Sequence, residues 1–520
     1  MIKIIEKFVP AGVRIEEYGN IYAYEMKVDD IVSAVNHLYF IEKLPLKLIT
    51  AMDERKESGS FRVMYIFGIP KENLFIAPYI RLKGSEEFPS VVKTIHEASG
   101  YERKIKTFFG LDPVGHPNPR PVILHGNWPK DVFPLRKDFD WRSRPAEAKN
   151  DYAFTKVEGE GIYEIPVGPV HAGIIEPGHF RFSVAGEEIV LLEPKLGYKH
   201  RGVEKLFEIL PLKEKLKLSE RVSGDSSFSH SLAFCQAVEA LGGVEVSAEA
   251  ANLRLIYAEL ERLANHLGDI GAIMIDTGFS FGGSHGARLR EMVMRLNERL
   301  TGSRYLRGVN AIGGVTKDIS PEAKDSLLKD LEALEKDFSE VMAIAENSNS
   351  LFNRLKETGT LNYQIALDHG TVGVAGRAVG ILNDARLDYP YAAYPDYDLE
   401  IASETKGDVY SRFYVRVKEV YSSIKLIEQA LQKNHEGKIL NDKKIELKKN
   451  SLAVGIVEGW RGDIVYFVAT DAQGEITRVE PRDPSFLNWT VLGHAGKGNV
   501  VPDFPLINKS FNLSYSGNDL

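Results

Sequence analysis

The stretch from Gly100 to Phe139 limits most strongly what this chain can fold into. It is dense in proline, glycine and charged residues, with aromatic residues spaced between them. Proline and glycine interrupt regular secondary structure, so this composition predicts an extended, irregular arm that packs on another surface. The same character continues through Trp141–Pro145. We therefore expect a domain boundary near residue 150, with one folded unit on each side of the arm.

The residues before the arm carry the patterns of a small α/β domain. Helical spacing runs over Asp30–Phe40, and a further helix is predicted from Ser90 through Ala98. Strands are predicted at Leu46–Thr50, Phe61–Phe67 and Phe75–Arg81. Pro78 marks the third of these as an edge strand or a bulge, because proline cannot donate to a sheet ladder. These patterns predict an α/β domain over residues 1–125 and an extended linker over residues 126–150.

Residues 151–520 have the patterns of a mainly helical bundle with peripheral β elements. Apolar residues recur at helical intervals over Ala248–Gly268 and over Val409–Leu431. Ser320–Glu322 supplies a capping serine, a proline at the first helical position and an acid in the first turn. The helix that it opens is predicted to run to about Ala345. Long helices of this kind form bundles, so the fold class is predicted to be α+β.

Composition excludes several classes of function. The net charge of −8 argues against nucleic acid as a partner, because phosphate-binding surfaces are basic. No run of about 18 or more apolar residues is present, and the charged N-terminus does not resemble a signal peptide, so a cytoplasmic chain is expected. Cys235 is the single cysteine, which excludes a four-cysteine zinc site and a self-contained iron–sulfur cluster. Its apolar neighbours predict a buried structural thiol.

Four short motifs in the arm carry a family resemblance. They are Tyr101–Arg103, Phe108–Leu111, Gly115–Pro117 and Pro134–Phe139. Together they resemble the signature of the 30-kDa subunit of respiratory complex I, a module that also occurs in energy-converting membrane-bound hydrogenases. The resemblance covers about the first 145 residues. It implies that the extended segment wraps the neighbouring large-subunit module.

The rest of the chain resembles a second subunit of the same complexes. The motifs are Gly168–Gly173, Glu176–Phe182, Gly197–Lys205, Glu261–Leu267, Asp384–Tyr391, Gly407–Phe413 and Glu458–Asp463. They resemble the 49-kDa subunit of complex I and the large subunit of group 4 energy-converting [NiFe] hydrogenases, of the formate hydrogenlyase type. The resemblance to the hydrogenase large subunits is the closer one, because Glu176–Phe182 matches their form of this motif. The chain is thus similar to two such subunits fused.

The resemblance also places a metal site whose ligands have changed. In the hydrogenases, cysteines stand at the positions of Ser223 and Ser226, and a second pair falls on Ser514 and Gly517. Serine hydroxyls are neutral and hard, so they hold neither nickel nor an iron–sulfur cluster. We therefore expect no metal in this chain and no activation of hydrogen by nickel. Asp225, between the first two positions, adds a carboxylate to the vacated pocket.

Three further candidates come from matched positions. His171 matches the first histidine of complex I's quinone-site loop, and would either bind a substrate carbonyl or satisfy loop backbone groups. Glu176 matches the hydrogenase glutamate that relays protons, with a structural carboxylate as the alternative. Arg221 matches an arginine beside the partner's cluster, where it could shift the potential of that cluster, and pairing with Glu220 or Asp225 is the alternative. Complex I's quinone-binding tyrosine falls on Gly224, which cannot make that hydrogen bond.

These resemblances imply a peripheral subunit on the cytoplasmic side of the membrane. The implied partners are a small subunit resembling the 20-kDa subunit of complex I with a [4Fe-4S] cluster, a ferredoxin-like iron–sulfur subunit, and membrane subunits of the antiporter and complex I subunit-1 types. The expected catalytic residues are His171, Glu176, Arg221 and Asp225, acting on a quinone-like or other acceptor with ion translocation.

Other functions remain open from the sequence. The chain is alternatively an inert scaffold and coupling subunit, an NADH:quinone oxidoreductase subunit proper, or a working hydrogenase. A cavity opening at Ser223–Ser226 would favour substrate reduction, and a filled, dry pocket would favour the scaffold.

Overall fold

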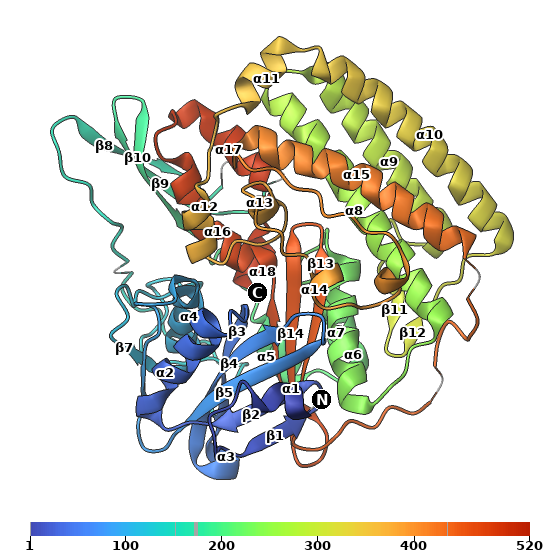
Figure 1. Cartoon of the computed structure of the whole chain (residues 1–520). Helices are drawn as coiled ribbons and strands as arrows, with labels where there is room; N and C mark the ends of the chain where they lie inside the picture. The colour runs from blue at the N-terminus through green and yellow to red at the C-terminus, as the bar shows by residue number, and fades with distance from the viewer. Residues whose placement is uncertain (1, 151, 171–174, 434, 442) are drawn as a thin grey trace.

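The computed structural model describes residues 2–150, 152–170, 175–433, 435–441 and 443–520 (Figure 1). Its N-terminal unit is built on a five-stranded sheet in the order β1-β2-β5-β4-β3. The strands are β1 (Ile15–Tyr18), β2 (Ile21–Glu25), β3 (Leu46–Glu54), β4 (Ser60–Ile69) and β5 (Leu74–Leu82). Only β2 and β5 run parallel within this sheet. The short helices α1 (Ile2–Glu6), α2 (Ile31–Asn36) and α3 (Arg55–Ser58) accompany it.

The prediction from Pro78 was wrong, because β5 is an interior strand between β2 and β4. Pro78 pairs with Tyr24 in the parallel register. On the other side the β4–β5 pairing is interrupted between Met64–Tyr79 and Phe67–Ile76, with the register unchanged, so no bulge forms. The sheet therefore tolerates a residue without an N–H by omitting ladder pairs on one side.

The predicted arm is only partly irregular. Its first residues form helix α4 (Ser99–Phe109), which begins just after the segment where the sequence predicted a helix. From Gly110 onward the chain is mostly irregular, apart from the short parallel pair β6 (Glu87–Pro89) and β7 (Asp112–Val114). Residues 100–109 were wrongly assigned to the arm because charged residues hide the apolar face of this helix, which packs into the N-terminal core.

The irregular segment packs on both units, as an arm should. Its apolar residues Ile123, Leu124 and Leu135 belong to the N-terminal core. Further along, Lys137 Nζ donates to the carbonyl of Thr477 at 2.6 Å, in the C-terminal unit. The boundaries at residues 125 and 150 stay a prediction, because this segment joins the two units.

Long helices form the bundle of the C-terminal unit (Figure 1). They are α8 (Ala248–Asp276), α9 (Ser280–Thr301), α10 (Pro321–Glu346) and α15 (Val409–Gln432). The predicted helix start is confirmed, since the Ser320 side chain accepts from the Ala323 N–H. Helices α8 and α9 approach closely where Gly271 faces Gly286, because a Cβ built on Gly286 would lie 2.5 Å from Gly271 Cα.

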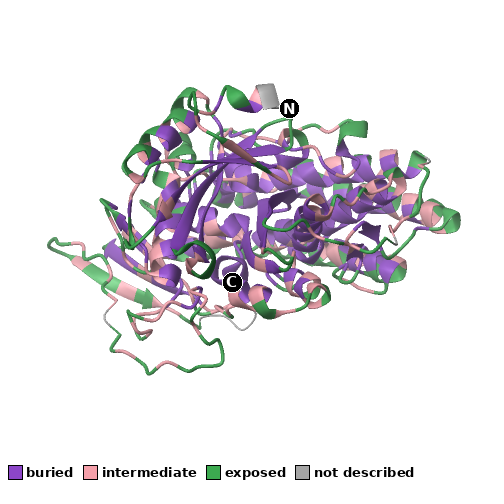
Figure 2. Ribbon diagram, turned by 90° about the horizontal axis from the view of Figure 1, so that it is seen from below, coloured by how far each residue is buried: buried purple, intermediate pink, exposed green. Residues whose placement is uncertain are grey.

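A three-stranded sheet joins the bundle to the N-terminal unit. It consists of β13 (Leu452–Gly459), β14 (Gly462–Thr470) and β15 (Ile476–Arg482). Successive side chains of a strand point to opposite faces. Accordingly Val454 and Phe467 pack in the N-terminal core, while Ala453 and Tyr466 pack in the helical core. Both faces of this sheet are therefore buried. Figure 2 shows buried residues in the sheets and in the helices next to them.

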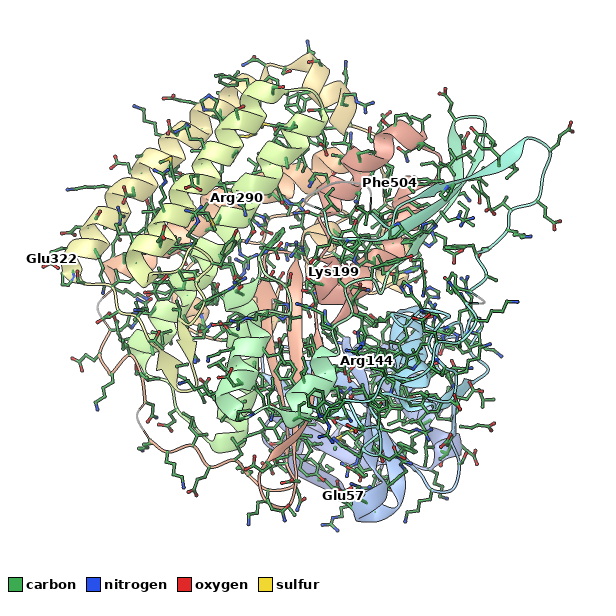
Figure 3. All side chains as sticks on the ribbon, turned by 180° about the vertical axis from the view of Figure 1, so that it is seen from behind. Glu57, Arg144, Lys199, Arg290, Glu322 and Phe504 are labelled. Atoms are coloured by element: carbon green, nitrogen blue, oxygen red, sulfur yellow. The ribbon has the colours of Figure 1, made fainter. Side chains whose placement is uncertain are left out.

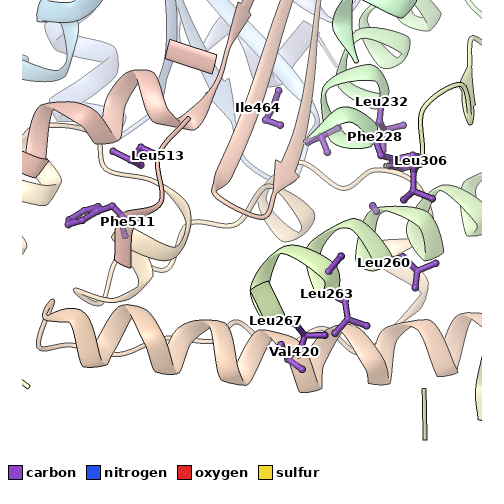
Figure 4. Packing of buried hydrophobic residues seen from close by; sticks show 14 of the residues in the cluster. Phe228, Leu232, Leu260, Leu263, Leu267, Leu306, Val420, Ile464, Phe511 and Leu513 are labelled. Atoms are coloured by element: carbon purple, nitrogen blue, oxygen red, sulfur yellow. The ribbon is translucent and has the colours of Figure 1, made fainter. Parts of the chain in front are cut away.

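The helical core fills the space between this sheet and the bundle. Figure 4 shows part of it, with Ile464 on β14, Phe228 on α7 (Ser227–Gly242) and Leu263 on α8. Cys235 on α7 is buried, which confirms the structural thiol. Shorter elements complete the unit: α5 (Val203–Ile209), α6 (Leu212–Ser219), β11 (Asn310–Ala311), β12 (Gly314–Val315), α11 (Asn349–Leu355), α12 (Tyr363–Asp368), α13 (Gly373–Arg377) and α14 (Ala385–Asp388).

The chain ends inside the molecule rather than on its surface. A projecting sheet of β8 (Ile162–Val167), β9 (His179–Ala185) and β10 (Glu188–Lys195) leads toward the three last helices. These are α16 (Pro484–Gly496), α17 (Phe504–Phe511) and α18 (Tyr515–Asp519). Leu520 is 3% exposed, and its carbonyl accepts from the Arg201 N–H at 2.7 Å. The α+β fold class is thus confirmed. No helix in the described part of the chain combines the length and apolarity needed to cross a bilayer.

Candidate functional site

The turn before α7 meets the tail before α18. Ser223 Oγ lies 2.8 Å from Ser514 Oγ, and both residues are buried. Ser514 also caps α18, because its hydroxyl accepts from the Gly517 N–H at 2.9 Å. Ser226 is 2% exposed at the start of α7. The structure thus brings the two predicted pairs, Ser223 with Ser226 and Ser514 with Gly517, into one buried region, which we call the serine cluster.

No side chain fits at Gly517. A Cβ built there would lie 2.5 Å from Asp483 Cγ and 2.6 Å from its Oδ2. Asp483 is itself fixed, since its Oδ2 lies 3.0 Å from His230 Nε2 and its Oδ1 accepts from the Ser485 N–H. Serine hydroxyls beside this carboxylate give a hard donor set, whereas the nickel–iron centre implied by the resemblance is held by soft thiolates. The residues present therefore do not fit a nickel–iron centre.

Asp225 forms an ion pair in the turn between Ser223 and Ser226. Both of its oxygens accept from the Arg461 guanidinium at 2.7 Å, and Ser223 Oγ donates to Oδ1 at 2.9 Å. Burial alone would raise the pKa of Asp225, but the charge and hydrogen bonds of Arg461 outweigh it and lower the pKa to about 2. Asp225 is therefore ionised at neutral pH. It orients Arg461 and cannot supply a proton.

The Asp225–Arg461 pair lies at a boundary between interior and water. The Asp225 side chain is 34% exposed, whereas that of Arg461 is 5% exposed. The Asp225 carbonyl accepts from Asn265 Nδ2 at 2.8 Å and from Trp460 Nε1 at 3.1 Å, which holds the turn rigidly. The site thus has a partly accessible carboxylate, Asp225, whose charge is balanced by the buried guanidinium of Arg461.

Arg461 links the serine cluster to buried charges in the bundle. Its Nε donates to the carbonyl of Asn512, and Asn512 Nδ2 donates to Asp269 at 2.6 Å. Asp269 also accepts from Arg416 Nε at 2.8 Å. The bundle contains a second set of buried charges. Arg377 pairs with Asp384, Glu419 and Glu458, and His266 Nε2 lies 2.6 Å from Glu419. Several of these residues come from the motifs that carried the family resemblance.

Glu261 is a candidate that sequence reasoning missed. Its carboxylate accepts from the N–H groups of Phe228 and Ser229 at 2.6 and 3.1 Å, and from Ser229 Oγ. Burial raises the pKa of Glu261 to about 7, even though these hydrogen bonds lower it, and the nearby charge of Asp225 adds to the rise. A carboxyl that exchanges its proton near neutral pH therefore lies beside the serine cluster. Its place in the Glu261–Leu267 motif was the available signal.

Arg461 is a second residue of the site that the sequence analysis did not identify. It lies in the Glu458–Asp463 motif, but nothing in the sequence says that it meets Asp225, which is 236 positions away. A carboxylate placed in a buried pocket requires a cation, and that requirement was the usable clue.

The remaining predicted residues have separate environments. Glu176 reaches the tail, because its Oε2 accepts from the Ser516 N–H at 2.9 Å and its Oε1 lies 3.8 Å from Lys199 Nζ. Lys199 lies beside the C-terminal helices (Figure 3). Arg221 is exposed and donates to the carbonyl of Lys217 at 2.6 Å. The pairing of Arg221 with Asp225 was wrong, since Asp225 pairs with Arg461. His171 lies outside the described residues.

Two family models match the chain. The model for the 49 Kd subunit of the respiratory-chain NADH dehydrogenase matches residues 276–519, and that for the 30 Kd subunit matches residues 24–145. The order of the two matches agrees with the fusion expected from the motifs.

Curated relatives give the same result. Formate hydrogenlyase subunit 5 of Escherichia coli is 34% identical over 501 residues, covering 95% of this chain and 88% of that protein. Hydrogenase-4 component G of the same organism is 35% identical over 500 residues, covering 95% and 87%. NADH-quinone oxidoreductase subunit 4 of Thermus thermophilus is 31% identical over 372 residues, covering 66% and 91%. The chain therefore belongs to the family of the complex I 49-kDa subunit and the group 4 hydrogenase large subunit, with the 30-kDa module fused before it.

Proposed function

We propose that this chain is the peripheral-arm subunit of a membrane-bound, energy-converting oxidoreductase that reduces an acceptor other than hydrogen ions. Electrons would arrive from a [4Fe-4S] cluster in a neighbouring small subunit, on the cytoplasmic side of the membrane. The names of the relatives, which include subunits of formate hydrogenlyase and NADH-quinone oxidoreductase, support membership of such a complex. They do not specify the acceptor.

One observation carries the proposal against hydrogen chemistry. The region where the hydrogenases have four thiolates contains hydroxyls, a glycine without room for a side chain, and the Asp225–Arg461 ion pair. A hard, charged environment of this kind suits the carbonyl oxygens of a quinone-like molecule better than a soft metal. Such an acceptor would approach from the side where Asp225 is partly exposed, and it would take its hydrogen bonds from the serine hydroxyls or the Arg461 guanidinium, because an ionised carboxylate only accepts.

Proton supply would come from groups beside the serine cluster rather than from Asp225. Reduction of a quinone to a quinol takes two electrons from the cluster and two protons from the protein or water. Glu261, with a pKa of about 7, and Glu176, which contacts both the tail and Lys199, are the proposed proton-handling groups. Ion translocation and contacts with ferredoxin-like, antiporter-like and subunit-1-like partners belong to the same proposal.

The test uses the intact complex purified from membranes. Nickel should be far below one atom per complex, and hydrogen oxidation should be absent. Reduced ferredoxin should drive reduction of a soluble quinone, and Arg461→Met should abolish that reduction while the Arg288→Met control retains it. Stoichiometric nickel with hydrogen turnover would overturn the proposal.

A scaffold and coupling role is the second candidate. It is favoured by the burial of Ser223, Ser226 and Ser514, whose hydroxyls contact one another or Asp225 and fill the interior of the turn. In that case Arg461→Met would leave electron transfer intact and would uncouple it from ion pumping in proteoliposomes. The two candidates are thus separated by one variant and two readouts.

A further inference from the structure

A cavity of about 480 Å³ lies away from the serine cluster, between the N-terminal unit, β10 and the C-terminal tail. Arg103 on α4, Lys195 at the end of β10, and Trp489 on α16 all line it. Because these residues come from three separate parts of the chain, the cavity forms only in the folded, fused protein. The function proposed above does not use it.

Lys195 is a buried cation without an ion-pair partner. The residue is 8% exposed, and among the described residues its ammonium has no ion pair or hydrogen bond. The ring of Tyr152 lies 4.4 Å from its Nζ. The ammonium is not fully enclosed, because the residue lines the cavity, but a side chain so little exposed carries its charge unfavourably when no carboxylate pairs with it.

The two acids whose charges reach Lys195 are Glu193 and Asp519, and both have other partners. Glu193 accepts from Arg120 at 2.7 Å, from the Tyr152 hydroxyl and from the Thr155 N–H. Asp519 accepts from the Lys199 N–H at 2.8 Å and from the Asn518 side chain. Neither carboxylate therefore neutralises Lys195 directly.

Arg103 adds a second cation to the same cavity. Its guanidinium donates to the carbonyls of Arg120 and Pro121 at 2.7 and 3.4 Å, and no carboxylate pairs with it in the described part of the chain. Burial first, and then repulsion from Arg103, lower the pKa of Lys195 to about 8, although Asp519 and Glu193 oppose the shift. Two positive groups therefore line this cavity, and no carboxylate of the described residues forms an ion pair with either of them, although Glu97 and Glu193 also line it.

We propose that this cavity binds a small organic oxyanion, a carboxylate or a phosphate ester, between Arg103 and Lys195. The planar guanidinium and the point-charge ammonium together match such a group. The apolar wall of Leu487 and Trp489 would contact the organic part of the ligand. The bound anion supplies the counter-charge that the chain lacks.

The side chain of Trp489 connects this cavity to the serine cluster. Trp489 lines the cavity, and its Nε1 donates to the carbonyl of Ser514 at 3.2 Å. Asn518, which also lines the cavity, follows Gly517 directly. A ligand here would thus act as an effector that fixes the position of the tail. The cavity and its two cations are present whether or not the proposed electron acceptor binds at the serine cluster.

The experiment measures the reactivity of Lys195 in the purified full-length chain. Competitive acetylation with mass spectrometry, near pH 8, should show Lys195 as a reactive lysine. Inorganic phosphate and citrate, tested separately, should each protect it and raise its pKa, because an anion stabilises the ammonium form. The stronger of the two probes identifies the preferred oxyanion.

Variants keep the test specific. Because Lys195→Met removes the acetylated amine, binding of the protecting anion to the variants is measured by isothermal titration calorimetry. Lys195→Met should weaken that binding by about tenfold or more, as expected for loss of a charge-assisted hydrogen bond. Lys497→Met removes an exposed cation at the cavity rim and should change binding by less than about threefold, because water screens it. Equal losses in both variants, or no protection of Lys195 by either anion, would overturn the proposal.

Discussion

Ser223 Oγ lies 2.8 Å from Ser514 Oγ, which joins the turn before α7 to the cap of α18 across 291 positions of sequence. This contact predicts that the double variant Ser223→Cys/Ser514→Cys forms a disulfide under mild oxidation, since the sulfur atoms need only approach to about 2.05 Å. Thiol titration in urea should then find Cys235 alone. The single variant Ser223→Cys is the control and should keep both thiols. Failure of the double variant to cross-link would show that the tail is placed elsewhere.

Asp225→Asn should destabilise the chain by about 1–2 kcal/mol at neutral pH, because it leaves the Arg461 guanidinium unpaired and water already screens the exposed part of the pair. The pKa of Asp225 is lowered from 3.8 to about 2, so its contribution is complete above pH 3.8 and is lost as the pH falls toward 2. Urea unfolding of both proteins across that window measures this. A stability difference that persists unchanged at the lowest pH would contradict the ion pair.

Gly517→Ala should cost about 1–3 kcal/mol, since its Cβ meets the Asp483 carboxyl at 2.5 Å. Gly224→Ala is the matched control in the facing turn. The nearest atom to a Cβ there is Arg307 Nη2, at 3.6 Å, so we expect little change. Thermal unfolding of the two variants compares them directly, and similar losses would mean that Gly517 is not packed against Asp483.

Glu261 gives a pH dependence of the opposite sign. Its pKa is raised from 4.5 to about 7, so the folded state keeps a proton that the unfolded state releases. Relative to Glu261→Gln, the wild-type chain should therefore lose roughly 3 kcal/mol of unfolding free energy as the pH rises from 4.5 to 7. Parallel stability curves for the two proteins would rule out a buried proton on Glu261.

Arg377→Met should be strongly destabilising, by about 3–5 kcal/mol, because it strips the buried carboxylates Glu419 and Glu458 of their shared cation. Arg288→Met breaks the exposed pair with Asp337 and should cost less than about 1 kcal/mol. Denaturant midpoints of both variants test this contrast. Comparable losses would indicate that the buried charges are not held by Arg377.

Local patterns were enough to predict the long helices. The Ser320 cap, the apolar spacing over Ala248–Gly268 and the run from Val409 each predicted a helix that the structure contains, because these signals act within a few residues. Pro78 and helix α4 were misjudged for the converse reason. Neighbouring strands in one case, and burial of one helix face in the other, outweighed the local composition.

The candidate site shows the same division. The sequence by itself determined that Ser223, Ser226, Ser514 and Gly517, the positions that the resemblance matches to metal ligands, hold no thiolate, and that Asp225 stands between the first two. Only the tertiary structure decided that Arg461 neutralises Asp225, that Asp483 fills the space beside Gly517, and that Lys195 has no ion pair among the described residues. Residue identity fixes which chemistry is available to a site. Charge pairing and burial depend on groups hundreds of positions apart, and only the folded chain brings these together.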